Sequence, residues 1–242
     1  MSAAPLQPLP ARDAVGSATL ERLAIANRFN RWMYEQIAPW IGASVLEIGS
    51  GIGNLSQFFA DRDRVVLTDT EPAYRAYLEG RFPDRSRVSV IPLTLPDVPP
   101  ALAADPVESV VCLNVLEHIE DDRASLAAMR RLLTPGGHLA LLVPALPWLY
   151  GTLDRALGHY RRYTRPLLRE RFTEAGFRLR RLSYFNLAGI TGWWLMGKVL
   201  RREVLPAASL SVYEALVPFF RLERFIPGRV GLSLIAIGER AS

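Results

Sequence analysis

An acid followed by three glycines at alternate positions marks the part of the chain best suited to chemistry. Glu47 ends an apolar segment, and Gly49, Gly51 and Gly53 follow it. Glycines at this spacing let the backbone turn tightly and approach a bound nucleoside without side-chain interference. The spacing differs from the G-x-G-x-x-G of dinucleotide enzymes, and the acid suits a cationic ligand better than a pyrophosphate. The pattern predicts a nucleoside site, with a purely structural turn as the alternative.

At these residues the chain resembles the class I S-adenosylmethionine-dependent methyltransferases, whose first motif reads E/D-x-G-x-G-x-G. A second acid, Asp69, stands at the end of the next apolar run. A carboxylate there can accept hydrogen bonds from both ribose hydroxyls, and an acid at this position does so in the family. A turn-forming aspartate before Glu71 and Pro72 is the structural alternative.

A third segment, Asn114 to His118, is similar to the N/D-x-L-E-H segment that follows the fourth strand in many small-molecule methyltransferases. The resemblance implies that Asn114 lines the methionine part of the cofactor. It also makes His118 the nearest candidate acid or base to the sulfonium. The alternative for His118 is an imidazole that holds the loop, and Glu117 could equally cap the next helix. The turn Pro135-Gly136-Gly137 also matches the family and has no predicted catalytic role.

The resemblance implies S-adenosyl-L-methionine as cofactor and S-adenosyl-L-homocysteine as product, and the sequence shows no metal-ligand cluster, so no metal is expected. In the family, the loop after the third strand often carries an acid that meets the adenine amino group. Residues 92–95 hold no acid here, so Thr94 or a backbone carbonyl is expected to serve instead. The complete predicted cofactor site consists of Tyr34, Glu47, Gly49, Ser50, Gly51, Gly53, Asn54, Asp69, Thr70, Thr94, Leu95, Asn114 and Val115.

A basic and aromatic segment, G-H-Y-R-R-Y-T over residues 158–164, follows the fifth predicted strand. Arginine forks bind carboxylate or phosphate through two hydrogen bonds. A similar G-H-x-R-R-Y segment occurs in a bacterial branch of the family. The alternative is a solvated loop or an arginine network through Asp154. The predicted substrate side consists of Tyr150, His159, Arg161, Arg162, Tyr163 and Trp193, and His118 and His159 are the two candidate catalytic residues.

Short apolar runs alternate with helical patterns, which predicts an α/β protein. Predicted strands cover 44–48, 64–68, 88–92, 109–114, 138–144, 177–184 and 231–239, and predicted helices cover 54–60, 72–80, 121–133 and 165–175. The expected fold is the Rossmann-like class I methyltransferase fold with a mostly parallel seven-stranded sheet. Ligands are then expected at the carboxyl ends of the strands.

The domain organisation predicted from these runs is a single methyltransferase domain over residues 18–242, after a flexible tail at 1–17. Within it we expect N-terminal helices at 18–43, the core at 44–185, a helical apolar cap at 186–228 and the last strand and C-terminus at 229–242. The cap contains the aromatic pairs Trp193-Trp194 and Phe219-Phe220. They suit burial against the sheet, an apolar substrate pocket or a surface that meets lipid. Arg201 and Arg202 would suit anionic head groups.

The composition narrows the function. The 242 residues include one cysteine, so an intrachain disulfide and a cysteine-based metal site are excluded. No signal peptide or membrane-spanning run is apparent, which predicts a cytoplasmic protein. The net charge is +5, and the arginine-rich region lacks a nucleic-acid-binding motif, so we expect no nucleic-acid partner. An anionic small molecule, an anionic membrane surface or solubility alone explains the charge better.

The predicted function is methyl transfer from S-adenosylmethionine to a small-molecule acceptor, which the apolar cap and the arginines suggest is amphipathic or anionic. Two alternatives stay open on the sequence. One is an NAD(P)-dependent oxidoreductase of the same fold class. The other is a non-catalytic cofactor-binding protein or membrane-surface scaffold.

Overall fold

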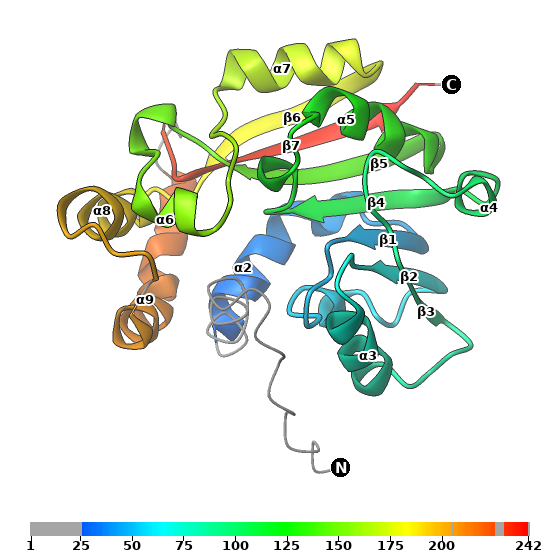
Figure 1. Cartoon of the computed structure of the whole chain (residues 1–242), viewed down its shortest axis with the longest axis horizontal. Helices are drawn as coiled ribbons and strands as arrows, with labels where there is room; N and C mark the ends of the chain where they lie inside the picture. Colours follow the sequence, from blue (N-terminus) through cyan, green and yellow to red (C-terminus); the bar gives the residue numbers. More distant parts are fainter. Residues whose placement is uncertain (1–25, 205, 226–229, 242) are drawn as a thin grey trace.

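The described strands form one sheet in the order β3-β2-β1-β4-β5-β7-β6 (Figure 1). The computed structural model describes residues 26–204, 206–225 and 230–241. The strands are β1 (Ser44–Ile48), β2 (Arg64–Thr68), β3 (Val88–Ile91), β4 (Val107–Leu113), β5 (Leu133–Pro144), β6 (Phe177–Phe185) and β7 (Ser233–Arg240). The predicted α/β fold with a mostly parallel seven-stranded sheet is confirmed.

Pairing within the sheet brings the carboxyl ends of the central strands to one edge. β1 pairs in parallel with β2 and β4, β2 with β3, and β4 with β5. β7 lies between β5 and β6 and runs antiparallel to both. The predicted glycine turn, second acid and N-x-L-E-H segment, which follow β1, β2 and β4, therefore end at the same edge.

Helices cover both faces of the sheet. The α-helices are α2 (Asn27–Ile37), α3 (Pro72–Arg81), α4 (Pro100–Ala103), α5 (Asp122–Arg131), α6 (Thr152–Ala156), α7 (Arg165–Glu174), α8 (Gly189–Trp194) and α9 (Ala207–Phe220). Shorter helical turns are η1 (Ala38–Trp40), η2 (Ser56–Phe58), η3 (Leu116–His118), η4 (Pro147–Leu149), the π-helical η5 (Leu195–Val199) and η6 (Arg221–Phe225). Figure 1 shows α5 and α7 on one side of the sheet and α2 and α3 on the other.

Local chemistry explains where α5 and α7 begin. The Asp121 side chain accepts a hydrogen bond from the backbone N–H of Ala124, and the Thr164 hydroxyl accepts one from Leu167. Both are N-cap bonds, which satisfy donors that the first helical turn leaves open. The helices therefore start close to the positions that the sequence predicts.

Alternating strand residues build two cores. Leu46 and Ile48 of β1 pack into the cluster with α5 and α7, whereas Val45 packs into the cluster with α2, α3 and α9. This alternation is the expected consequence of side chains pointing to opposite faces of a strand. Because both faces are buried, the sheet is a rigid support for groups at its edge.

The predicted helix at 54–60 is wrong. This segment forms turns and the short 3₁₀ turn η2. The Ser56 hydroxyl donates a hydrogen bond to the Glu47 carboxylate, and the Phe59 ring is fully buried. These tertiary contacts fix the backbone more strongly than the weak helix propensity of a short segment.

The segment predicted as an apolar cap contains α8, η5, α9 and η6, all before β7. The predicted tail at 1–17 and the beginning of the N-terminal helical segment lie outside the described residues. No helix in the described ranges is long and apolar enough to cross a bilayer.

Candidate active site

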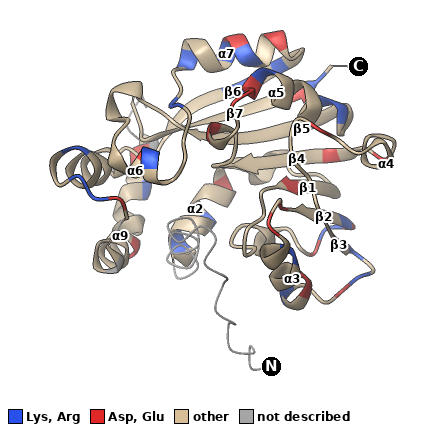
Figure 2. Ribbon diagram, viewed as in Figure 1, with Lys and Arg blue, Asp and Glu red and all other residues tan. Residues whose placement is uncertain are grey.

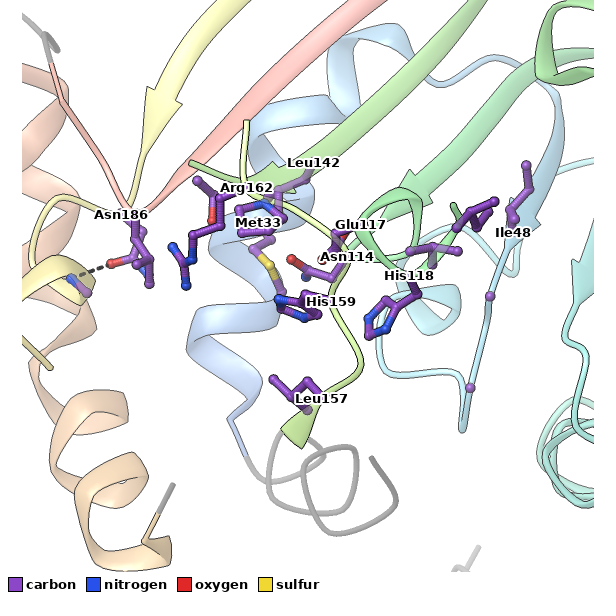
Figure 3. Close-up of a pocket in the computed structure, with 18 of the residues that line it drawn as sticks. Met33, Ile48, Asn114, Glu117, His118, Leu142, Leu157, His159, Arg162 and Asn186 are labelled. Carbon is purple, nitrogen blue, oxygen red and sulfur yellow. Dashed lines mark hydrogen bonds between the residues drawn. The ribbon is translucent and has the colours of Figure 1, made fainter. Parts of the chain in front are cut away.

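A cavity of about 1050 Å³ opens at the carboxyl ends of β1, β2 and β4. One end is lined by the glycine turn after β1, the acid after β2 and the loop after β4 (Figure 3). The other end is lined by α2 and by the cap helices α8 and α9. In an open α/β sheet this edge is where ligands bind.

Positive backbone angles explain the glycines of the turn. The φ angles of Gly49, Gly51 and Gly53 are 69°, 54° and 79°. A Cβ atom on Gly49 would lie 2.5 Å from Cγ2 of Val115, which follows β4. Such a contact is too short for any side chain, so glycine is needed both for conformation and for space.

Asp69 closes the turn from the next strand. Its Oδ2 accepts the Gly51 N–H over 2.8 Å, and its Oδ1 accepts the Glu71 N–H over 2.9 Å. Burial raises the pKa of Asp69, although both backbone bonds oppose the rise. The side chain lines the cavity. Because each carboxylate oxygen can accept more than one bond, Asp69 retains acceptor capacity for ligand hydroxyls.

Glu47 supports the turn from beneath and does not line the cavity. Its carboxylate accepts a hydrogen bond from the Ser56 hydroxyl, and burial raises its pKa to about 7.

Two other predicted cofactor residues have structural contacts. The Ser50 hydroxyl accepts the Thr68 N–H over 3.2 Å, which links β1 to β2. The Tyr34 ring stacks on Phe58 with 5.3 Å between centroids.

The predicted cofactor residues thus fall into two groups. Those that line the cavity are Gly49, Gly51, Asp69, Thr70, Thr94, Leu95, Asn114 and Val115. Those outside the lining are Tyr34, Glu47, Ser50, Gly53 and Asn54. Leu93 joins Thr94 and Leu95 in the lining after β3, and this loop stretch offers no acid to the cavity.

The loop after β4 turns its polar groups towards the cavity. Asn114 adopts a φ of 56°, and its N–H donates to the Leu142 carbonyl over 2.9 Å. The side chains of Asn114, Glu117 and His118 all line the cavity (Figure 3). Glu117 is only 1% exposed, and burial raises its pKa to about 8. The sequence leaves Glu117 as a possible helix cap, but the structure places its side chain in the cavity wall.

Asp154 organises the segment predicted as the substrate side. This fully buried carboxylate accepts from Nε of Arg162 over 2.7 Å and from the Trp193 indole over 3.1 Å. Nδ1 of His159 lies 3.0 Å from the same carboxylate, and the Gly151 N–H donates to it over 2.9 Å. Burial raises the pKa of Asp154, but its bonds with His159 and Arg162 outweigh this and lower it.

His159, Arg162 and Trp193 line the cavity, as the sequence predicts for a substrate side, and Asp154 holds all three. The Arg162 guanidinium lies 4.8 Å above the Trp193 ring and donates to the Ala145 carbonyl over 2.8 Å. The rings of His118 and His159 meet edge to face, with 4.7 Å between centroids.

The structure does not bring the other three predicted substrate residues into the cavity lining. Arg161 donates to the carbonyls of Ile119 and Glu120 over 2.8 and 2.6 Å. The Tyr163 hydroxyl donates to Asp122 over 3.1 Å, and the Tyr150 hydroxyl donates to the His159 carbonyl over 2.6 Å. These side chains fix the loops around the cavity. Within the G-H-x-R-R-Y motif, Arg162 therefore lines the cavity, whereas its neighbours Arg161 and Tyr163 hold loops in place.

Sequence reasoning misses the residues that line the apolar end. This end consists of Phe29, Met33, Leu157, Phe185, Met196, Leu210 and Tyr213. Asn186 belongs to the same region, and its Oδ1 accepts the Gly189 N–H over 2.8 Å and also the Tyr213 hydroxyl. The helical spacing of such residues predicts burial, but it does not distinguish a pocket wall from a core.

Sheet order, glycine turn and strand-end acid together define a Rossmann-like nucleoside-binding protein. A sequence profile of the methyltransferase domain matches residues 46–139. A probable S-adenosylmethionine-dependent methyltransferase of Mycolicibacterium smegmatis is 30% identical over 185 residues, which cover 72% of this chain and 69% of that protein. The chain belongs to the S-adenosylmethionine-dependent methyltransferases, and its sheet order is that of class I.

Other relatives match over shorter stretches. The human thiol S-methyltransferase TMT1B is 33% identical over 45% of this chain and 47% of that protein. The ubiquinone biosynthesis O-methyltransferase of Xylella fastidiosa is 33% identical over 42% of each chain. The chain also matches only 4% of the length of the reducing polyketide synthase Preu2 of Preussia isomera.

Solved structures agree on the fold. An S-adenosylmethionine-dependent methyltransferase from Mesorhizobium loti superposes with a TM-score of 0.59 at 13% identity, covering 86% of this chain and 97% of that chain. The N-methyltransferase NodS of Bradyrhizobium japonicum, solved with S-adenosyl-L-homocysteine, superposes with a TM-score of 0.55 at 16% identity, covering 87% of this chain and 84% of that chain.

Family membership implies S-adenosylmethionine as cofactor and S-adenosylhomocysteine as product, and the residues present fit this group. The Gly49 cradle has no room for a Cβ, and Asp69 presents a buried carboxylate beside it. These are features that close approach by a nucleoside requires. The family assignment also sets aside the oxidoreductase alternative.

Proposed function

We propose that the protein transfers a methyl group from S-adenosylmethionine to a nucleophile on an amphipathic small molecule. The arrangement of this cavity carries the proposal. Its nucleoside end lies at β1 and β2, its apolar end lies under α8 and α9, and His118 and His159 lie between them. Figure 3 shows the two imidazoles between Ile48 at the end of β1 and Asn186 next to the cap.

The chain's own residues would act by binding and alignment. Bound S-adenosylmethionine supplies an electrophilic methyl group on a sulfonium centre. Asp69 and the glycine turn would hold the nucleoside, and Asn114 would face the methionine part. His118 and His159, the proposed catalytic residues, would contact the nucleophile of the acceptor. Alignment and exclusion of water account for much of the rate in such a reaction.

The lining favours an acceptor with an apolar body over a strongly anionic one. Arg162 is the only arginine among the described residues that line the cavity, and its charge is paired with Asp154. Arg161, the second arginine of the motif, contacts the loop after β4 instead. The sequence-based expectation of an anionic acceptor counted both arginines, so it loses much of its support.

Calorimetric titration and a transfer assay test this function. We expect one S-adenosylmethionine site per chain, with S-adenosylhomocysteine as a competitor and no comparable binding of NAD(H). Incubation with methyl-labelled S-adenosylmethionine and fractionated extract of the source cell should place the label in the organic-soluble fraction. Label confined to the aqueous fraction would contradict an amphipathic acceptor, and absence of cofactor binding would contradict the function as a whole.

We further propose that the cap contacts an anionic membrane surface. Large apolar side chains of the cap are strongly exposed, including Val212 at 61% and Phe219 at 68%. Lys198, Arg201 and Arg202 are exposed and flank the exposed Val199 and Leu200 in the chain, and Figure 2 shows basic residues at this end of the molecule. An apolar surface with flanking cations is suited to an interface of acyl chains and anionic head groups.

Vesicle flotation tests this contact. The protein should float with vesicles containing phosphatidylglycerol and much less with phosphatidylcholine alone. Phe219→Ser and Arg201→Glu should each weaken flotation, whereas Trp148→Ser, which alters an exposed aromatic outside the cap, should not. Equal flotation of all variants, or self-association through the cap without vesicle binding, would contradict the proposal.

A further inference from the structure

Three side chains of types that bind metals meet in the cavity. Ligand atoms of Glu117, His118 and His159 all lie within 4.8 Å of one another. Figure 3 shows the three side chains converging from the loop after β4 and from the segment that precedes α7. The sequence does not reveal this group, because Glu117 and His159 lie far apart in the chain and form no ligand-spacing motif.

Glu117 carries the strongest indication that something binds here. It is 1% exposed, and its Oε2 has no hydrogen-bond partner among the described residues. Buried polar atoms are nearly always satisfied, and an unpaired buried carboxylate is costly. Glu117 is one of the residues that line the cavity. A cation placed between Oε2 and the imidazoles would satisfy this oxygen.

The buried Asp154 carboxylate already orients the His159 ring. Nδ1 of His159 lies 3.0 Å from the buried Asp154 carboxylate. A carboxylate at this nitrogen fixes the ring orientation and leaves Nε2 as the ligand atom, an arrangement typical of metal-binding histidines. Arg162 and Trp193 also bond to Asp154, so this carboxylate is held in place.

The geometry points to a binding site for one divalent transition-metal ion, formed by Glu117, His118 and His159. Two imidazoles and one carboxylate suit Zn²⁺, Co²⁺, Fe²⁺ or Mn²⁺, and three protein ligands leave coordination positions open towards the cavity. The role of the ion rests on the proposed function, in which His118 and His159 would then act on the nucleophile through the ion. An ion at this position would coordinate an oxygen or sulfur nucleophile of the acceptor and lower its pKa.

Co²⁺ titration of the chelator-treated protein, without cofactor or acceptor, tests the site. We expect visible d–d absorption bands and binding of one Co²⁺ per chain by calorimetry, with competition by Zn²⁺. Glu117→Gln and His118→Ala should each weaken Co²⁺ binding by about tenfold or more. His118 is exposed, so its replacement should leave the fold intact, which circular dichroism checks.

Matched controls are available within the chain. His138, the third histidine, lies on β5 near Glu239, and Glu120 lines the cavity outside the group of three. His138→Ala and Glu120→Gln should bind Co²⁺ as the wild type does. The proposal is overturned if the wild type binds no Co²⁺, or if His118→Ala binds it equally well. Cofactor titration is separate, so failure of the metal site and failure of the methyltransferase function are distinguishable.

Discussion

The Gly51 N–H donates to Oδ2 of Asp69 over 2.8 Å, which joins the turn after β1 to the acid after β2. The second Asp69 oxygen accepts the Glu71 N–H. One carboxylate therefore fixes two loops at the end of the cavity that we propose binds the nucleoside. Its charge is held in place before any ligand arrives, which reduces the ordering cost of binding.

Asp69→Asn should weaken S-adenosylmethionine binding by about tenfold to a hundredfold, because a charge-assisted acceptor contributes roughly 1.5–3 kcal/mol. The asparagine amide has only one oxygen, so its NH₂ group would face one of the two backbone N–H groups that donate to Asp69. Calorimetric titration measures the affinity. Asp61→Asn, at an exposed acid, is the control and should bind normally. Equal affinities would show that Asp69 serves only the turn.

Gly49→Ala should abolish measurable cofactor binding. The new Cβ would lie 2.5 Å from Val115 Cγ2, at a φ of 69° that disfavours side chains. The turn must therefore shift at the point where the ligand approaches the backbone. Gly80→Ala is the matched control, because nothing lies near its Cβ position in α3. That variant should retain binding, with stability unchanged or raised by up to about 1 kcal/mol.

Most of the sheet can be predicted from the sequence because its strands are short apolar runs bounded by turn residues. The predicted strand 44–48 matches β1 residue for residue, since Ser44–Ile48 ends at the glycine turn. The predicted strand 138–144 is too short, because β5 begins at Leu133 and passes through the Pro135-Gly136-Gly137 turn. Proline and glycine residues predict a break in the chain there, but pairing of Leu133 with Val107 of β4 starts the strand before them.

The candidate site is only partly predictable because its far end depends on tertiary contacts. Residues on strand ends, such as Asp69 and Asn114, follow from topology. Asp154 follows only in part: the sequence offers an arginine network through it, which Arg162 confirms, but it does not predict the donor from Trp193 of α8. The G-H-x-R-R-Y motif identifies an unusual segment but not the direction of each side chain, so Arg162 faces the cavity while Arg161 contacts the loop after β4.

The pKa of Glu47 predicts a pH-dependent stability. Burial raises it from an ordinary value of 4.5 to about 7, so the folded chain binds more protons than the unfolded chain between these values. The unfolding free energy should therefore fall as pH rises from about 4.5 to 7, by at most about 3 kcal/mol from this group, and stay low above pH 7.

Glu47→Gln should remove this loss while an amide oxygen still accepts the Ser56 hydroxyl. Urea unfolding of both proteins at pH 5 and pH 8 measures it. We expect the stability of the variant relative to the wild type to rise by about 2–3 kcal/mol between these pH values. Glu79→Gln, at an exposed acid, should show no such change. Parallel pH profiles of Glu47→Gln and wild type would contradict the prediction.

Asp154, which bonds to three residues of the cavity lining, should be a strongly stabilising charged group. Asp154→Ala leaves the buried Arg162 charge without its partner and removes the acceptor for the Trp193 indole. Breaking a buried pair in this way costs about 3–5 kcal/mol. Urea unfolding should show this loss, and the α8 region should become more susceptible to limited proteolysis because its indole bond to the core is gone.

A matched surface pair provides the control for that loss. Asp105 pairs with Arg64 over 2.6 Å, but its side chain is 70% exposed. Asp105→Ala should therefore cost less than about 1 kcal/mol. The double variant Asp154→Leu with Arg162→Met should recover part of the stability lost in Asp154→Ala, because removing both charges leaves no uncompensated one. If Asp154→Ala costs no more than Asp105→Ala, the Asp154 carboxylate is not the strongly stabilising group predicted here.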